Sequence, residues 1–161
     1  MRQHLARIAG WWALLGGGLL LVIIAITSWN VGAFILGVQG LPGYEDAVRL
    51  LISAAALMFF PWCQARRGHV AVDIFVSGLS ERSRARLERV WLAMTALAAL
   101  FLCYWMIIGL LETRADRTAT SILGWLEWPF YLPGVVSLAL WAAVAAAQAA
   151  SANATESLHG A

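Results

Sequence analysis

The stretch IAGWWALLGGGLLLVIIAITSWNVGAFILGVQGLPGY, residues 8–44, contains no charged residue. A helix needs about 20 predominantly apolar residues to cross the hydrocarbon core of a bilayer, so this stretch can hold one full crossing and the turn after it. Three more charge-free runs follow, the first of them only just long enough: residues 50–65, 90–111 and 128–155. We therefore predict an all-α integral membrane protein with four transmembrane helices, at about 11–36, 46–63, 88–111 and 129–150.

Composition supports this class. The chain has 161 residues, of which 61% are hydrophobic and only 12% are charged. Charged residues make up about 25% of an ordinary soluble domain, and a soluble domain of this size has too little interior to hide so much apolar surface. We expect one membrane domain over residues 1–161, with an inner loop at 64–87 and a disordered tail at 151–161. The first apolar stretch is longer than the core of a signal peptide, which favours an uncleaved first helix.

Arginines predict how the chain lies in the membrane. All 11 basic residues are arginine, and most of them precede the first helix or lie between the second and third: Arg2, Arg7, Arg66, Arg67, Arg82, Arg84, Arg86 and Arg89. Short cytoplasmic loops collect basic residues, so we predict that both the N- and C-termini are cytoplasmic. On a membrane loop, the expected partners of Arg66, Arg82, Arg84, Arg86 and Arg89 are anionic lipid headgroups rather than nucleic acid.

The inner loop carries the densest polar cluster, in PWCQARRGHVAVDIF at residues 61–75. Residues 69–80 fit both the alternation of a strand and the period of a helix. A lone strand at a membrane surface would leave its backbone unpaired, so we predict an interfacial amphipathic helix between the second and third crossings. His69 and Asp73 lie four residues apart on its polar side. They form either a pH-sensitive or partner-binding pair or a solvated pair that orders the loop.

No catalytic constellation appears in the sequence. The three histidines, His4, His69 and His159, lie outside the predicted crossings, which disfavours a haem-binding anchor because axial ligands would have to come from inside the bundle. Cys63 and Cys103 do not form a CxxC pair, and we interpret both as packing residues. We therefore expect no enzyme activity, no cofactor and no metal.

Polar residues inside the predicted helices are few. Arg49 lies about one turn inside the second helix, and Glu45 precedes it by four residues, the favourable order for a helical ion pair. We interpret this pair as a structural or intersubunit contact rather than a substrate site. Asn30, with Thr27 and Ser28 nearby, is expected to hydrogen-bond across helices.

Small residues and prolines indicate how the helices pack and begin. Gly16, Gly17 and Gly18 in the first helix, and the alanines of LALWAAVAAAQAA in the last, predict close helix contacts. Pro129 and Pro133 fall in the opening turns of the last helix, where proline is tolerated.

Three stretches together resemble a known family: YEDAVRLLISAAALMFFPW, RRGHVAVDIFVSGLSERSRARL and TATSILGWLEWPFYLPGVV. Their order and spacing, with four crossings, resemble the small membrane subunit (the Q or DctQ-like subunit) of tripartite ATP-independent periplasmic (TRAP) transporters over about residues 10–150. The resemblance implies a non-catalytic permease subunit in the bacterial inner membrane. It would scaffold a large membrane subunit during sodium-coupled uptake of an organic acid that a periplasmic solute-binding protein delivers.

The candidate structural or subunit-interface residues are Glu45, Arg49, Arg67, Gly68, His69, Asp73, Pro129 and Pro133. Of these, Gly68, His69 and Asp73 match the family's inner-loop pattern. Two other functions stay open from the residues: a self-sufficient small transporter formed by homo-oligomerisation, and the membrane anchor of a redox enzyme.

Overall fold

Long helices account for most of the chain in the computed structural model, which describes residues 2–66 and 81–159. The elements are α1 (Arg2–Ile35), α2 (Tyr44–Ala65), α4 (Glu81–Ala115), the short 3₁₀ helix η1 (Trp128–Phe130) and α5 (Tyr131–His159). Four helical stretches are long and apolar enough to cross a membrane: 4–35, 44–65, 89–115 and 128–150. These confirm the prediction of four membrane-spanning helices.

The helix ends differ from the predicted boundaries. α1 already begins at Arg2, and α4 begins at Glu81, because no proline or glycine interrupts either segment before its apolar run. α5 continues to His159, where we expected a disordered tail from residue 151. Residues 151–159 contain neither glycine nor proline, so nothing in them ends the helix. Pro61 does not end α2 either, since the helix continues to Ala65.

The predicted interfacial helix lies outside the described residues. So do Arg67, Gly68, His69 and Asp73. Both the interfacial helix and the role of these four residues therefore stay predictions.

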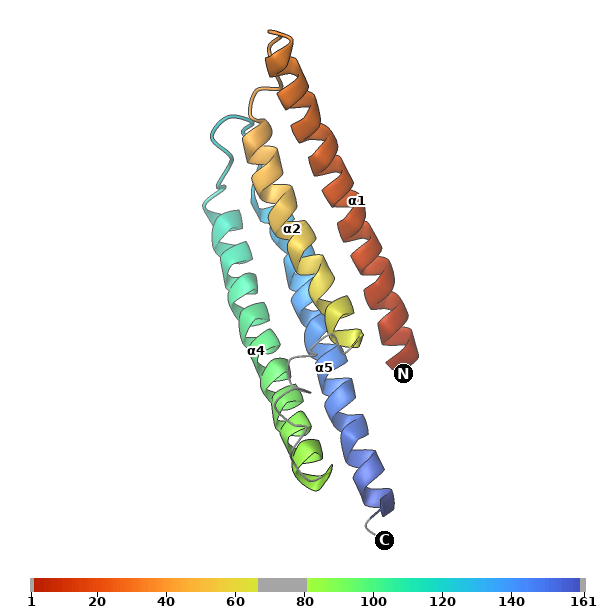
Figure 1. The fold of residues 1–161 in the computed structure, drawn as a ribbon. Coiled ribbons are helices and arrows are strands. Elements are labelled where there is room, and N and C mark those ends of the chain that lie inside the picture. Colours follow the sequence, from red (N-terminus) through yellow and green to blue (C-terminus); the bar gives the residue numbers. More distant parts are fainter. Residues whose placement is uncertain (1, 67–80, 160–161) are drawn as a thin grey trace.

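The helices stand side by side in the order α1, α2, α5, α4. α2 and α5 pack against each other in the centre, α1 packs mainly on α2, and α4 packs on α5 (Figure 1). We call α2 and α5 the central pair, and α1 and α4 the flanking helices. Both chain ends lie at one end of the bundle, the terminal end. The connections at residues 36–43 and 116–127 form the opposite end, the loop end.

Small residues permit this close packing. A Cβ at Gly16 of α1 would lie 3.0 Å from the Cβ of Met58 and 3.3 Å from the carbonyl oxygen of Ala55, both in α2. At Gly134 of α5 it would lie 2.9 Å from Leu57 Cδ1. Within lipid, such close approach supplies the van der Waals contact that holds helices together. Gly17 and Gly18 do not take part, because a Cβ at either would meet no atom within 4 Å.

Buried amides join the central pair near the terminal end. Gln64 Nε2 donates a hydrogen bond to Gln148 Oε1 at 2.8 Å, and Gln148 Nε2 donates to the carbonyl oxygen of Gln64 at 2.9 Å. The indole nitrogen of Trp141 also donates to Gln64 Oε1, at 3.3 Å. Both glutamine side chains are buried, so these bonds satisfy polar groups that neither lipid nor water reaches.

Candidate functional site

The flanking helices present most of the large apolar side chains that the bundle leaves exposed. Along α4 a single stripe at helical spacing runs through Met94, Leu97, Phe101 and Trp105. Each of these side chains is at least 55% exposed. In the central pair, by contrast, few large apolar residues are exposed. The flanking helices are therefore the surfaces available to lipid or to another membrane protein.

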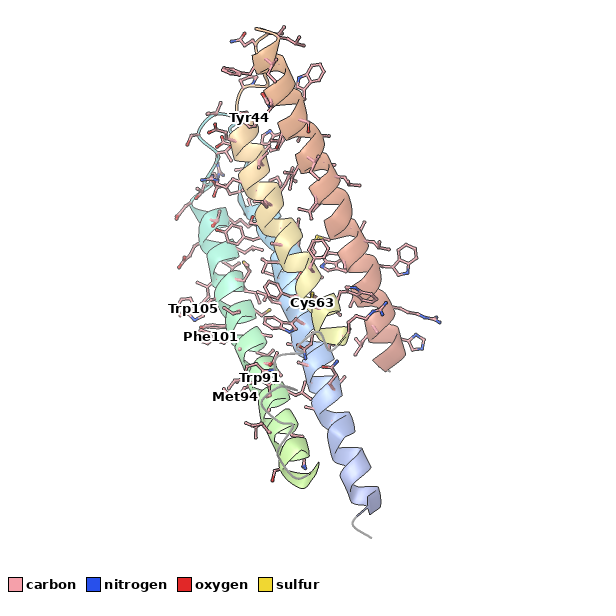
Figure 2. The ribbon with its side chains drawn as sticks, in the orientation of Figure 1. Tyr44, Cys63, Trp91, Met94, Phe101 and Trp105 are labelled. Atoms are coloured by element: carbon pink, nitrogen blue, oxygen red, sulfur yellow. The ribbon has the colours of Figure 1, made fainter. Side chains whose placement is uncertain are left out.

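An aromatic patch stands out on α4, made by Phe101, Tyr104 and Trp105. The Trp105 ring meets Phe101 edge-on, with centroids 6.3 Å apart, and meets Tyr104 in the same way at 6.0 Å. Figure 2 shows Phe101 and Trp105 on the side of α4 that points away from the other helices. The three rings form one edge-to-face cluster, an arrangement that aromatic quadrupoles favour.

The depth of this patch is unusual for side chains that face lipid. It lies at the middle of the 89–115 stretch, whereas tryptophan and tyrosine prefer the two membrane–water interfaces. Trp91 and Trp128 follow that preference, since they lie near the two ends of the apolar stretches of α4 and α5. Tyr104 is 62% exposed, and the described residues supply no hydrogen bond to its hydroxyl. If this face met only acyl chains, the Tyr104 hydroxyl would lack a hydrogen-bond partner, which is costly.

Arg49 forms an ion pair that differs from the predicted one. Its Nη2 lies 2.9 Å from Glu127 Oε1, so α2 is tied to the segment before η1 rather than to its own Glu45. Glu45 is exposed on the first turn of α2. The Arg49 side chain is 64% exposed and Glu127 20% exposed, which makes this a surface contact near the loop end.

Asp46 and Asn30 anchor the connections of the loop end. Asp46 Oδ2 accepts hydrogen bonds from the backbone N–H groups of Ile122 at 3.0 Å and Leu123 at 3.4 Å. Asn30 Oδ1 accepts one from the Leu41 N–H at 2.9 Å, so it orders its own connection instead of bonding across to another helix as we expected. These bonds attach both connections to helices and give the loop end a defined shape.

Glycine is required where these two connections meet. Gly43, which precedes α2, has a φ of 74°, a conformation that disfavours other residues. A Cβ there would also lie 2.8 Å from Leu123 Cγ. The same residue thus permits both the turn into α2 and the close approach of the 116–127 connection.

Charged groups are missing from the interior of the described bundle. Among the residues whose burial the structure describes, the buried polar ones are Asn30, Gln64, Thr120, Ser137 and Gln148. No group of three metal-ligating side chains occurs among the described residues. Cys63 is exposed and Cys103 is buried, and both are free thiols. The described part of the chain thus offers amides and hydroxyls for packing, and no charged site within the crossings.

The remaining predicted residues fall at the two ends of the bundle. Pro129 lies in η1 and Pro133 in the first turn of α5, both at the loop end with Arg49. Arg66 caps the C-terminus of α2 at the terminal end, where α4 carries Arg82, Arg84, Arg86 and Arg89 near its start. The structure therefore does not gather these residues into one site.

Sequence reasoning missed two features. The Gln64–Gln148 contact joins residues too distant in sequence for any local pattern to reveal. The aromatic patch did leave a signal, because Tyr104 and Trp105 sit in the middle of an apolar run instead of at its ends.

Most of the chain matches the model of a known protein family. The DctQ component of tripartite ATP-independent periplasmic transporters matches residues 23–154, which is most of the chain. Comparison with curated proteins and with solved structures gives no match.

Proposed function

Because the chain belongs to the DctQ component family of tripartite ATP-independent periplasmic transporters, we propose that it is a non-catalytic scaffold for the large membrane subunit. The family match confirms the resemblance found in the sequence, and the chain is the small membrane subunit of such a transporter. The family works with a large membrane subunit and a periplasmic binding protein. Sodium coupling and an organic-acid substrate are part of the proposal and follow from the family resemblance.

The single observation that supports a scaffold most strongly is the uncharged interior of the described bundle. Ion-coupled transporters place ionisable side chains near the middle of the membrane, where they bind the ion or the substrate. Here the buried polar groups are amides and hydroxyls, and Arg49 is largely exposed near the loop end. These groups are suited to holding helices together, so the ion and substrate sites are assigned to the large subunit.

We infer that the scaffold contact lies on α4, at the aromatic patch of Phe101, Tyr104 and Trp105. Its rings supply a large rigid apolar surface, and the Tyr104 hydroxyl can donate a hydrogen bond to a partner helix. In the most apolar 18-residue stretch of α4, only 11% of the residues are buried within the chain. Much of the surface of this helix is therefore open to a partner subunit.

Membrane orientation completes the proposal. The arginines of the terminal end favour the cytoplasm, in the bacterial inner membrane. The loop end then faces the periplasm, from which the binding protein delivers the substrate. Its exposed acidic and basic residues, such as Glu45 and Arg117, are accessible to that protein.

Reconstitution into proteoliposomes tests the proposal. We expect sodium-driven uptake only when this chain, the large subunit and the binding protein are all present, and none with this chain alone. Omitting this chain should reduce uptake while leaving the binding protein's affinity for substrate unchanged. Uptake by this chain alone would establish a self-sufficient transporter, and haem absorbance of the purified chain would indicate a redox anchor; either result contradicts the scaffold function.

A further inference from the structure

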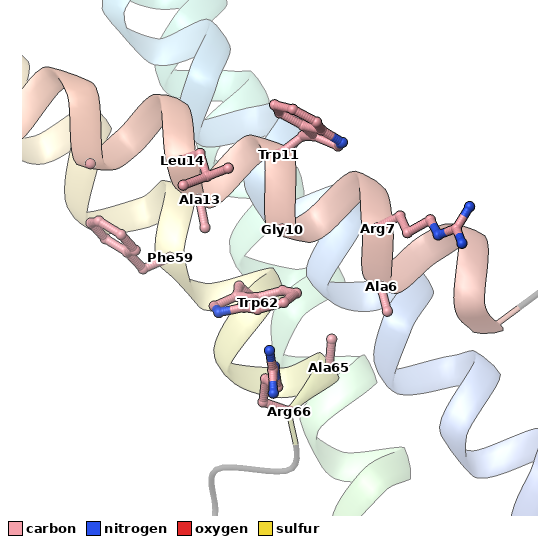
Figure 3. Close-up of a pocket in the computed structure, with 11 residues that line it drawn as sticks. Ala6, Arg7, Gly10, Trp11, Ala13, Leu14, Phe59, Trp62, Ala65 and Arg66 are labelled. Carbon is pink, nitrogen blue, oxygen red and sulfur yellow. The ribbon is translucent and has the colours of Figure 1, made fainter.

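A groove of about 710 Å³ lies between α1 and α2 at the terminal end (Figure 3). Its apolar lining comes from Gly10, Leu14 and Gly17 of α1 and from Phe59 and Trp62 of α2. The lining residues of α1 run from Ala6 to Gly17, so the groove extends for about 17 Å along the helix axis at 1.5 Å per residue. Such a channel is long and apolar enough to hold part of an acyl chain.

Two glycines shape the groove in different ways. A Cβ at Gly10 would lie 2.9 Å from Trp62 Cζ3, so the indole ring lies directly against the α1 backbone. At Gly17, by contrast, a Cβ would meet no atom within 4 Å. The space above Gly17 is therefore empty rather than filled by a neighbouring side chain of the described chain.

Positive charge collects at one end of this groove. Arg7 and Arg66 line the end closest to the start of α1 and the end of α2. The Arg66 guanidinium lies 4.6 Å from the centre of the Trp62 ring, which orients it while leaving its N–H groups available. Among the residues that the structure describes, no carboxylate lines the groove. An apolar channel that ends in two arginines complements a molecule with a long apolar tail and an anionic head.

We propose that this groove binds one anionic phospholipid, with an acyl chain along Leu14 and Gly17 and the phosphate at Arg7 and Arg66. The guanidinium groups donate charge-assisted hydrogen bonds to phosphate oxygens, the geometry that arginine favours for such groups. Trp11 and Trp62 lie near the level of the headgroups, where tryptophan is favoured. The lipid fills the cleft between α1 and α2 and so stabilises the position of α1, the flanking helix that contacts α5 least.

A lipid fits this groove better than a helix from the large subunit. A partner helix packed here would cover Arg7 and Arg66, take their guanidinium groups out of water, and have to supply its own acidic groups to pair with them. The lipid headgroup supplies the negative charge and remains in contact with water. This inference is independent of the scaffold function, since the groove and its arginines lie away from the aromatic patch of α4.

Native mass spectrometry of the delipidated full chain tests the proposal. The chain is titrated with phosphatidylglycerol, with phosphatidylcholine of the same acyl chains, and with glycerol phosphate alone. Each arginine near an anionic lipid contributes on the order of fivefold in affinity. We therefore expect phosphatidylglycerol to bind about 30-fold more tightly than phosphatidylcholine. Glycerol phosphate should not bind, because it lacks the acyl chain.

Two sets of variants locate the site. The double variant Arg7→Gln/Arg66→Gln should lose the preference for phosphatidylglycerol, whereas Arg117→Gln, at the exposed loop end, should retain it. Gly17→Leu should fill the groove and weaken binding of both phospholipids. Gly18→Leu is its matched control, because Gly18 is also free of neighbours but does not line the groove. If loss of the two arginines impairs membrane insertion, the comparison of Gly17→Leu with Gly18→Leu still tests the proposal.

Several results would overturn the proposal. They are equal affinity for the two phospholipids, tight binding of glycerol phosphate alone, or unchanged lipid binding in Gly17→Leu. A photo-crosslinker at the position of Leu14, in the complex with the large subunit, should label lipid. Labelling of the large subunit there would show that a protein helix occupies the groove instead.

Discussion

The central pair and the flanking helices make opposite use of similar apolar segments. In the most apolar 18-residue stretch of α2 and of α5, 33% of the residues are buried inside the bundle. The corresponding share is 22% in α1 and 11% in α4. The central pair carries fully buried alanines such as Ala55 and Ala145, together with the Gln64–Gln148 contact. The flanking helices instead expose leucine, isoleucine, phenylalanine and tryptophan.

This difference shows which residues define the interior of a membrane bundle. In water, large apolar side chains gather inside because their exposure is costly. In lipid that drive is absent, so small residues that permit close approach and polar groups that need partners occupy the interior. The flanking helices can expose apolar surface without penalty, which leaves them free to contact lipid or a partner subunit.

The largest expected effect comes from enlarging a buried alanine. Ala145 is 0% exposed, so Ala145→Leu would force extra carbon atoms into filled space in the central pair. We expect the free energy of unfolding to fall by about 1–3 kcal/mol. Thermal unfolding of the full chain in detergent measures it. Ala25→Leu on the exposed face of α1 is the matched control and should change little. Equal losses for the two variants would remove the distinction between central and flanking helices.

A smaller loss is expected at the buried amides. Gln64→Leu removes its side-chain hydrogen bonds with Gln148 and Trp141. Interhelical bonds of this kind contribute about 0.6 kcal/mol on average within membranes, so we expect a loss of about 1 kcal/mol in the same unfolding measurement. Thr95→Val on α4 is the control, because the Thr95 hydroxyl bonds only the Trp91 carbonyl oxygen of its own helix. A stabilised Gln64→Leu chain would show that the amides do not hold the central pair together.

The smallest effect on stability is expected at the exposed end of the central pair. Arg49→Ala removes the ion pair with Glu127, and surface ion pairs contribute only about 0–1 kcal/mol. We expect the isolated chain to unfold nearly as before, while the yield of complex with the large subunit falls. Affinity purification of the complex measures that yield. Unchanged yield with weakened substrate affinity would assign Arg49 to substrate binding, against a structural function.

Charge-free runs were enough to predict the four crossings, because the length of an apolar run translates directly into a span. The small residues at 16–18 predicted a close helix contact, and Gly16 makes it with α2, whereas a Cβ at Gly17 or Gly18 would meet no atom within 4 Å. The partner of Arg49 was not predictable. The nearby Glu45 satisfied the local rule for helical ion pairs. The fold instead pairs Arg49 with Glu127, which follows α4 in the sequence.

Which apolar face stays exposed was also beyond the sequence. α1, α4 and α5 are apolar all round, so periodicity does not distinguish the face toward a neighbouring helix from the face toward lipid. Packing decides this, and it places Trp105 outside while it buries Cys103, two residues away. Buried small residues and exposed aromatic residues became distinguishable only with all four helices in place.

Photo-crosslinking from α4 tests the scaffold account most directly. p-Benzoylphenylalanine is placed at the position of Trp105, and separately at the position of Leu21, which is exposed on α1. The chain is then expressed with the large subunit and the binding protein and is irradiated in membranes. The scaffold account predicts a covalent adduct with the large subunit from position 105. An adduct only between copies of this chain, or adducts with the large subunit from position 21 alone, would contradict it.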